Sequence, residues 1–279
     1  MTNIENLLTQ AEALMSRLET LLPAVTPAPD WSALAWRWRK SALQTVTHPQ
    51  HLKLQDFLGI DDQKNTVLQN TRQFVQGLPA NNVLLTGARG TGKSSLIKAL
   101  LTEFSALGLR LIEVDKHDLI DLHDITELLR DRPEKFIIFC DDLTFDANEP
   151  GYKALKVALD GSVAGVADNM LIYATSNRRN LMPEFMADNV GGSDEIRPRE
   201  TIDEKIALSE RFGVWLSFYP FDQDEYLAIV QSWLKHFGIT QMTEEMRRAA
   251  LQWSLTRGSR SGRVAWQFAR DWAGKQQLK

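Results

Sequence analysis

The sequence predicts an α/β fold, in which a parallel sheet of five strands with helices on both faces is followed by a small all-α lid domain. Three observations carry this prediction. Short apolar segments alternate with segments of helical periodicity between residues 54 and 220, which is typical of a parallel sheet buried on both faces. A glycine-rich loop joins the first apolar segment to a helix. After Pro220 every periodic segment is helical.

Residues 1–53 are predicted to form a helical N-terminal extension and linker, and they are a candidate partner-binding region. Apolar side chains recur every three or four positions over 3–22, which predicts an amphipathic helix that pairs with another copy, packs on its own protein or stays mobile. Three prolines then end this helix. In the stretch 31–40, tryptophans interleave with arginine and lysine. These side chains could stack on nucleic-acid bases and bind phosphates, anchor a protein partner, or cover part of the hydrophobic core.

The remaining elements follow from periodicity and length. Short apolar runs predict strands at 82–86, 109–114, 136–140, 170–175 and 214–219. Helical periodicity predicts connecting helices at 93–107, 117–130 and 151–160, and C-terminal helices at 222–237, 243–256 and 261–273. The polar stretch 181–200 contains glycine and is predicted to be a loop. The predicted domains are therefore 1–53, 54–220 and 221–279.

Composition excludes several classes of protein. The chain has 279 residues, of which 43% are hydrophobic and 24% charged, so collagen-like, disordered and disulfide-scaffold classes are out. No apolar run reaches the roughly 18 residues of a membrane span, and the first residues lack the basic region of a secretory signal. The single cysteine, Cys140, fits a core position. We expect a cytoplasmic protein without membrane contact.

Charge is unevenly distributed, although the net charge is only −4. Residues 31–53 contain four basic and no acidic side chains, and residues 243–279 contain eight basic and three acidic ones. These basic ends flank an acidic middle. They either contact an anionic partner such as nucleic acid or form solvated helix faces with a few functional arginines.

The glycine-rich loop fits the pattern G-x-x-x-x-G-K-[ST] and predicts a phosphate site. Glycines let backbone N–H groups curl round phosphates, and the N-terminus of the following helix adds partial positive charge. Lys93 is expected to reach the β- and γ-phosphates of ATP, and the hydroxyl of Ser94 is expected to bind Mg²⁺. The predicted nucleotide contacts of this loop are Gly87, Ala88, Arg89, Gly90, Thr91, Gly92, Lys93, Ser94 and Ser95.

Polar residues follow two of the predicted strands. Asp141 and Asp142 come directly after the strand 136–140, and Asn177 follows the strand 170–175. Carboxyl ends of parallel strands face the ligand crevice of such sheets. Asp141 is therefore expected in the Mg²⁺ shell, Asp142 is placed to orient or deprotonate an attacking water, and Asn177 can touch the γ-phosphate or that water. The alternatives are a capping Asp pair and an Asn at an ordinary turn.

The order of these motifs resembles an AAA+ ATPase over about residues 54–275. The resemblance implies that Gly59 and Ile60, in FLGIDDQ, line the adenine pocket. It implies that Arg211, in SERFG, is an arginine finger that reaches the γ-phosphate of a neighbouring subunit, and hence that the chain forms a homo-oligomer. Arg263 in GSRSGRVA, with Arg260 as the alternative, would contact the nucleotide from the lid. The loop, FCDDLTF and SGRVA together are similar to an uncharacterised bacterial family of AAA+-like ATP-binding proteins.

Two departures from the superfamily pattern bear on function. Asp142 stands where glutamate is usual, which predicts slow turnover because its side chain is one methylene shorter. The aromatic-apolar-glycine pore loop of polypeptide-threading relatives is absent, which argues against an unfoldase. The sequence therefore predicts an ATPase that remodels an unknown macromolecule. The alternative is a slow or non-hydrolysing nucleotide switch, an adaptor or loader that binds protein or DNA through residues 1–53.

Overall fold

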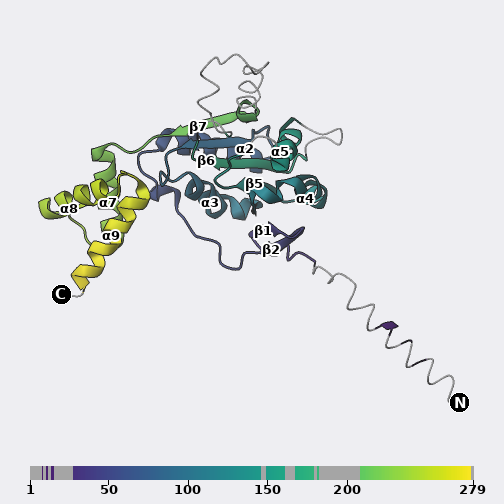
Figure 1. Cartoon of the computed structure of the whole chain (residues 1–279), viewed down its shortest axis with the longest axis horizontal. Coiled ribbons are helices and arrows are strands. Elements are labelled where there is room, and N and C mark those ends of the chain that lie inside the picture. The colour runs from purple at the N-terminus through teal and green to yellow at the C-terminus, as the bar shows by residue number, and fades with distance from the viewer. Residues whose placement is uncertain are drawn as a thin grey trace, which may run out of the picture. The chain divides into compact units, whose positions relative to one another are not determined.

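The computed structural model describes residues 28–145, 149–160, 167–178, 181 and 208–277, together with 8, 11, 14 and 15 (Figure 1). The chain divides into two compact units, Met1–Asp30 and Trp31–Lys279. In the first unit, residues 8, 11, 14 and 15 are helical, and the side chains of Leu8, Leu14 and Met15 are exposed. The second unit contains the sheet and all the residues considered below.

The five predicted strands form a continuous parallel sheet. They are β3 (Val83–Gly87), β4 (Leu109–Val114), β5 (Lys135–Cys140), β6 (Met170–Ser176) and β7 (Val214–Phe218). Within the full strand order β2-β1-β4-β5-β6-β3-β7, the phosphate-loop strand β3 lies between β6 and β7. The carboxyl ends of these parallel strands share one edge of the sheet, and there the polar motifs meet.

The sheet has two strands more than the sequence predicted, and they lie in the segment expected to be a helical extension. A hairpin of β1 (Ala35–Arg39) and β2 (Ala42–Thr45) adds to the edge of β4, with β1 parallel to it. From Trp36 to Arg39 in β1, buried and exposed side chains alternate with the two-residue period of a strand. Lys40 and Ser41, both at positive φ, form the two-residue turn. Such turns usually contain Asn-Gly or Asp-Gly, so this sequence lacks the signal.

The hairpin and the residues before it place the tryptophan side chains of the segment 31–40 against the core of the sheet. Trp36 and Trp38 are 1% and 4% exposed and pack in the core, so the interpretation that these rings stack bases is wrong. Trp38 Nε1 donates a hydrogen bond of 2.9 Å to Asp121. Trp31 packs edge-on against Phe136, and the guanidinium of Arg132 lies 4.3 Å from its ring centroid. The expectation that this segment covers the core is the one the structure supports.

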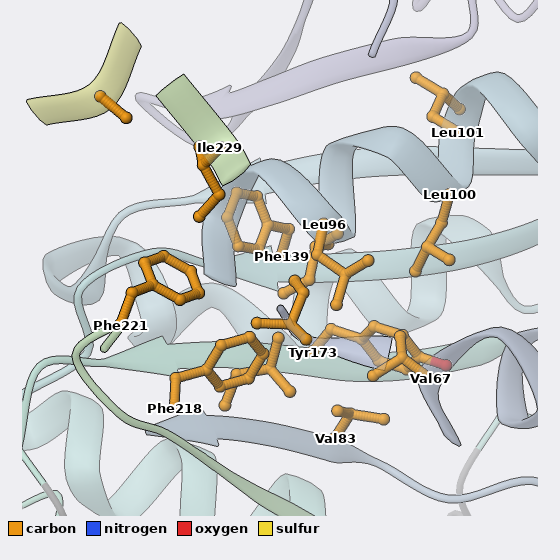
Figure 2. Packing of buried hydrophobic residues seen from close by; sticks show 14 of the residues in the cluster. Val67, Val83, Leu96, Leu100, Leu101, Phe139, Tyr173, Phe218, Phe221 and Ile229 are labelled. Carbon is orange, nitrogen blue, oxygen red and sulfur yellow. The ribbon is translucent and has the colours of Figure 1, made fainter. Parts of the chain in front are cut away.

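Helices cover both faces of the sheet. Helices α2 (Asp61–Val75) and α3 (Lys93–Phe104) share one hydrophobic cluster with alternate side chains of the parallel strands. Figure 2 shows Leu96 of this cluster beside Phe139, and Leu96 and Leu100 of α3 above Tyr173. Helices α4 (Leu122–Leu129) and α5 (Pro150–Asp160) pack with the other alternate residues. Short 3-10 turns lie before α2 at Leu54–Asp56, directly after α3 at Ser105–Leu107 and directly before α4 at Lys116–Asp121. Apart from residue 181, the predicted loop 181–200 lies outside the described residues.

Three helices follow the sheet and form the part we call the lid: α7 (Gln223–His236), α8 (Glu244–Thr256) and α9 (Gly262–Gln277). Helix α7 begins with a capping box, in which Asp222 accepts from Glu225 N at 2.8 Å and Glu225 accepts from Asp222 N at 2.9 Å. Tyr226 of α7 donates to the carbonyl of Ala250 in α8. Over the described ranges, every helix is too short or too polar to cross a membrane.

Candidate nucleotide-binding site

A cleft of about 860 Å³ lies at the carboxyl edge of the sheet. It is lined by the phosphate loop, by the ends of β5 and β6, by the segment before α2 and by the lid. The predicted site residues that line it are Ile60, Arg89, Gly90, Thr91, Gly92, Lys93, Ser94, Ser95, Asp141, Asp142, Asn177 and Arg263. Segments far apart in the sequence thus converge on one cavity.

The phosphate loop is held in place by backbone geometry that only glycine allows. Gly87 has a φ of +124°, and a Cβ at this position would lie 1.9 Å from the carbonyl oxygen of Phe218 in β7. Ala88 N donates to that same oxygen at 3.0 Å. Gly90 and Gly92 also have positive φ, and α3 begins after Gly92 without a side-chain cap. The loop therefore presents backbone N–H groups and a helix N-terminus to the cleft.

Lys93 is the first residue of α3, and its side chain is nearly buried. Its Nζ donates to the carbonyl oxygens of Gly87 and Ala88, both at 2.7 Å, and to Asn177 Oδ1 at 3.3 Å. Burial lowers the pKa of Lys93 to about 8, although the nearby carboxylates of Asp141 and Asp142 act in the opposite direction. An incoming phosphate would supply a stronger anionic partner for this ammonium group.

The two acids after β5 have different surroundings. Asp141 Oδ1 accepts three hydrogen bonds, from Ser94 Oγ at 2.5 Å, Thr175 Oγ1 at 2.6 Å and Asp142 N at 3.1 Å. Asp142 adopts a left-handed φ of +50°, and its carboxylate accepts from Asn177 Nδ2 at 2.5 Å. Asn177 therefore links the carboxylate of Asp142 to the ammonium group of Lys93.

The donor set beside Ser94 fits Mg²⁺. A serine hydroxyl and an aspartate carboxylate lie in direct contact, and hard oxygen ligands of this kind suit that ion. Mg²⁺ is usually held by one or two carboxylates together with substrate phosphates. No group of three or more His, Cys, Asp or Glu residues that could hold a metal occurs in the described part of the chain. Cys140, which precedes Asp141, is a core residue, and burial raises the pKa of its thiol to about 12.

The cleft also has an apolar, largely aromatic lining, of which only Ile60 was predicted from the sequence. Apolar side chains from the pre-α2 segment and the lid form this lining, here called the aromatic wall: Phe57, Leu58, Ile60, Phe221, Ile229, Trp233 and Trp266. Gly59 has a φ of +73°, and a Cβ there would lie 3.0 Å from the ring of Phe221. A flat aromatic base fits such a wall. The lid aromatics occur at ordinary helical spacing, so only the fold distinguishes them from core residues.

The arginines divide into two groups. Arg263 lines the cleft near the start of α9, and its backbone N donates to Gly90 O at 3.3 Å. Arg260 is not among the lining residues of the described chain, and its carbonyl accepts from Phe221 N. Arg211 is not brought into this cleft; its Nε forms an ion pair with Asp160 at the end of α5.

The fold, a mostly parallel α/β sheet followed by a helical C-terminal part, is similar to that of solved structures of RuvB from Thermotoga maritima. Two variants of that protein match with TM-scores of 0.52 and 0.52, at 15% and 14% identity, over 78% of this chain. A third matches with a TM-score of 0.51 at 15% identity, also over 78% of this chain. This chain spans 63%, 63% and 64% of the RuvB chains.

A search of curated proteins found no match. A family profile matches residues 30–276, which is most of the chain and includes the β1–β2 hairpin, the sheet, the cleft and the lid. The chain belongs to the family described as "Protein of unknown function (DUF815)".

Proposed function

We propose that this protein binds ATP in the cleft, hydrolyses it with Mg²⁺ and uses the cycle to remodel a macromolecular partner. The observation that carries the proposal is the network at the carboxyl edge of the sheet. Lys93, Asn177 and Asp142 are joined by hydrogen bonds beside the Ser94–Asp141 pair. Phosphate-binding, metal-binding and water-activating groups thus line one cavity whose aromatic wall suits a base.

Each residue has a distinct role in this mechanism. Lys93 exchanges its two loop carbonyls for phosphate oxygens, while the loop N–H groups bind the rest of the polyphosphate. Ser94 and Asp141 would hold Mg²⁺, which neutralises phosphate charge when bound. Asp142 accepts the proton of the attacking water, and Asn177 holds the Asp142 carboxylate in place.

Residues outside the network complete the proposal. Arg263 contacts the phosphates from the lid, and its position beside Gly90 couples lid and loop. Arg211 acts at the nucleotide of a neighbouring subunit in a homo-oligomer, where it would neutralise charge that develops on the γ-phosphate. The ion pair with Asp160 anchors Arg211 through Nε. Ile60, which lines the cleft, and Gly59, which lies close to the ring of Phe221, would support the adenine.

A non-hydrolysing nucleotide switch is the second candidate. It is favoured by Asp142, whose short side chain is already engaged by Asn177. Such a switch would act as an adaptor or loader. Arg37 and Arg39 of the hairpin already form ion pairs with Glu113 and Asp115. The partner of such a switch would therefore bind the other N-terminal residues or the basic segment 243–279. A cytoplasmic location stays a prediction from the sequence.

Nucleotide binding by matched lysine variants tests the proposal. Lys93→Ala should abolish ATP binding, whereas Lys98→Ala, on the same helix but beside Phe139, should bind like the parent. Hydrolysis per subunit should rise with protein concentration and should be lost in Arg211→Ala. Equal ATP binding by the two lysine variants would refute the site. Tight binding without hydrolysis at any concentration would favour the switch.

A further inference from the structure

Thr175 makes three hydrogen bonds with the acidic turn after β5, although the sequence analysis assigned it no role beyond the strand 170–175. It lies one residue before the end of β6 and is 2% exposed. Its hydroxyl donates to Asp141 Oδ1 at 2.6 Å and accepts from Asp142 N at 3.0 Å. Its carbonyl accepts from Leu143 N at 2.7 Å. Three consecutive residues of the turn are therefore attached to one threonine.

The register of the sheet explains this position. Cys140 pairs with Ala174, so the residue after each lies at the same level of neighbouring strands. Asp142 then leaves the strand at a φ of +50°, a conformation that non-glycine residues rarely adopt. The threonine hydroxyl donates its one proton to Asp141 and accepts a hydrogen bond from the Asp142 N–H. These two bonds fix the orientation of the hydroxyl group.

We propose that Thr175 is a positioning residue for both acids: it orients Asp141 toward Mg²⁺ and fixes the backbone turn that aims Asp142 at the attacking water. This inference rests on the proposed function. All three bonds to Asp141 fall on Oδ1, so the hydroxyl sets which carboxylate oxygen faces Ser94 and which faces away. Ser94 alone cannot fix the rotation of this carboxylate, because its hydroxyl must itself turn toward the metal.

A purely structural role predicts a different outcome from substitution. The backbone of β6 is held by pairing with β5 and β3, and the Leu143 N–H bond goes to the Thr175 carbonyl. Thr175→Val keeps those bonds and removes only the hydroxyl. We therefore expect this variant to fold and to bind ATP like the parent in the absence of Mg²⁺. With Mg²⁺, its kcat should fall roughly 10- to 100-fold, as for a misplaced general base.

The test compares ATP binding and turnover in the full chain. Tryptophan fluorescence reports binding, because Trp233 and Trp266 line the cleft. ATP affinity is measured in chelator and then over a Mg²⁺ titration, together with kcat, KM and the melting temperature. For Thr175→Val, the Mg²⁺ concentration at which half of the Mg²⁺-dependent change in ATP affinity is reached should rise about tenfold. An effect of this size is expected when a metal ligand, here Asp141, loses a hydrogen bond that orients it. Thr175→Ser, which keeps the hydroxyl, should restore both readouts.

Thr71→Val provides the matched control. Thr71 is a buried threonine of α2 whose hydroxyl bonds Val67 and Tyr173, away from the acids. It should change stability but neither the Mg²⁺ response nor kcat. The inference is overturned if Thr175→Val matches the parent, if Thr71→Val shows the same losses, or if Thr175→Ser fails to restore them. Should the valine variant not fold, Thr175→Ala carries the same expectation.

The outcomes also separate this inference from the proposed function. A parent that does not bind ATP overturns both. A parent that binds Mg²⁺–ATP without hydrolysis overturns the ATPase, while the Mg²⁺ titration still decides the role of Thr175. A parent that hydrolyses ATP, with a Thr175→Val variant that does so equally well, leaves the ATPase intact and overturns this inference alone.

Discussion

The affinity for ATP should fall as the pH rises through 8, because the unliganded cleft holds Lys93 with a pKa of about 8. Phosphate binding favours the charged lysine and raises that pKa, so binding requires the protonated form. With a pKa of 8, the protonated fraction in the free protein falls from about 0.9 at pH 7 to about 0.1 at pH 9. The dissociation constant should therefore rise about tenfold between these two pH values.

Calorimetry provides the direct assay. At pH 8, ATP binding should take up about half a proton, which is measured by titration in two buffers of different ionisation enthalpy. Lys93→Arg is the control, since a guanidinium stays charged throughout this range and its variant should show no such uptake. A parent whose ATP affinity stays constant from pH 7 to 9 would refute the reasoning, because the lysine would then already be fully charged in the free cleft.

Three further predictions follow from the same geometry. Lys93→Met should stabilise the unliganded fold at pH 7 by up to ~3 kcal/mol, since burying the charged lysine lowers its pKa from 10.5 to about 8. Chemical denaturation measures the free energy of unfolding of both proteins, and a variant less stable than the parent would contradict the prediction. Gly87→Ala should unfold the phosphate loop, because its Cβ would lie 1.9 Å from the Phe218 carbonyl. Melting curves followed by circular dichroism should show a large fall in the melting temperature. Gly77→Ala is the control for positive φ, because a Cβ there would have no neighbour within 4 Å. Trp266→Ala should weaken ATP binding about 5- to 100-fold by loss of stacking while leaving inorganic triphosphate binding unchanged; equal effects on both ligands would exclude a base contact.

Much of the sheet could be predicted because its strands are local signals. Buried parallel strands are short apolar runs, and the phosphate loop adds a fixed spacing of glycine and lysine. The β1–β2 hairpin could not be predicted in this way. Its turn residues, Lys40 and Ser41, are not typical of the turn type, and its strands are stabilised by pairing with β4, which is far away in the sequence.

In the candidate site, too, residues with a local sequence signal could be predicted, and residues that depend on contacts between distant segments could not. The sequence predicts a shared site for five residues because each lies at or next to the end of a strand or helix. These residues, Lys93, Ser94, Asp141, Asp142 and Asn177, line one cleft. Thr175 and the aromatic wall were missed because their roles depend on contacts between distant segments. Trp233 and Trp266 lie on lid helices, and Thr175 faces the acids only through the pairing of β5 with β6.

Phosphate release by an Asp142→Asn variant tests the central claim most directly. Asparagine keeps the size of the side chain and an oxygen that can accept from Asn177, but it cannot take a proton from water. We predict that the variant binds Mg²⁺–ATP like the parent and releases phosphate at least about 100-fold more slowly. A variant that hydrolyses ATP as fast as the parent would contradict the assignment of Asp142 as the base in this cleft.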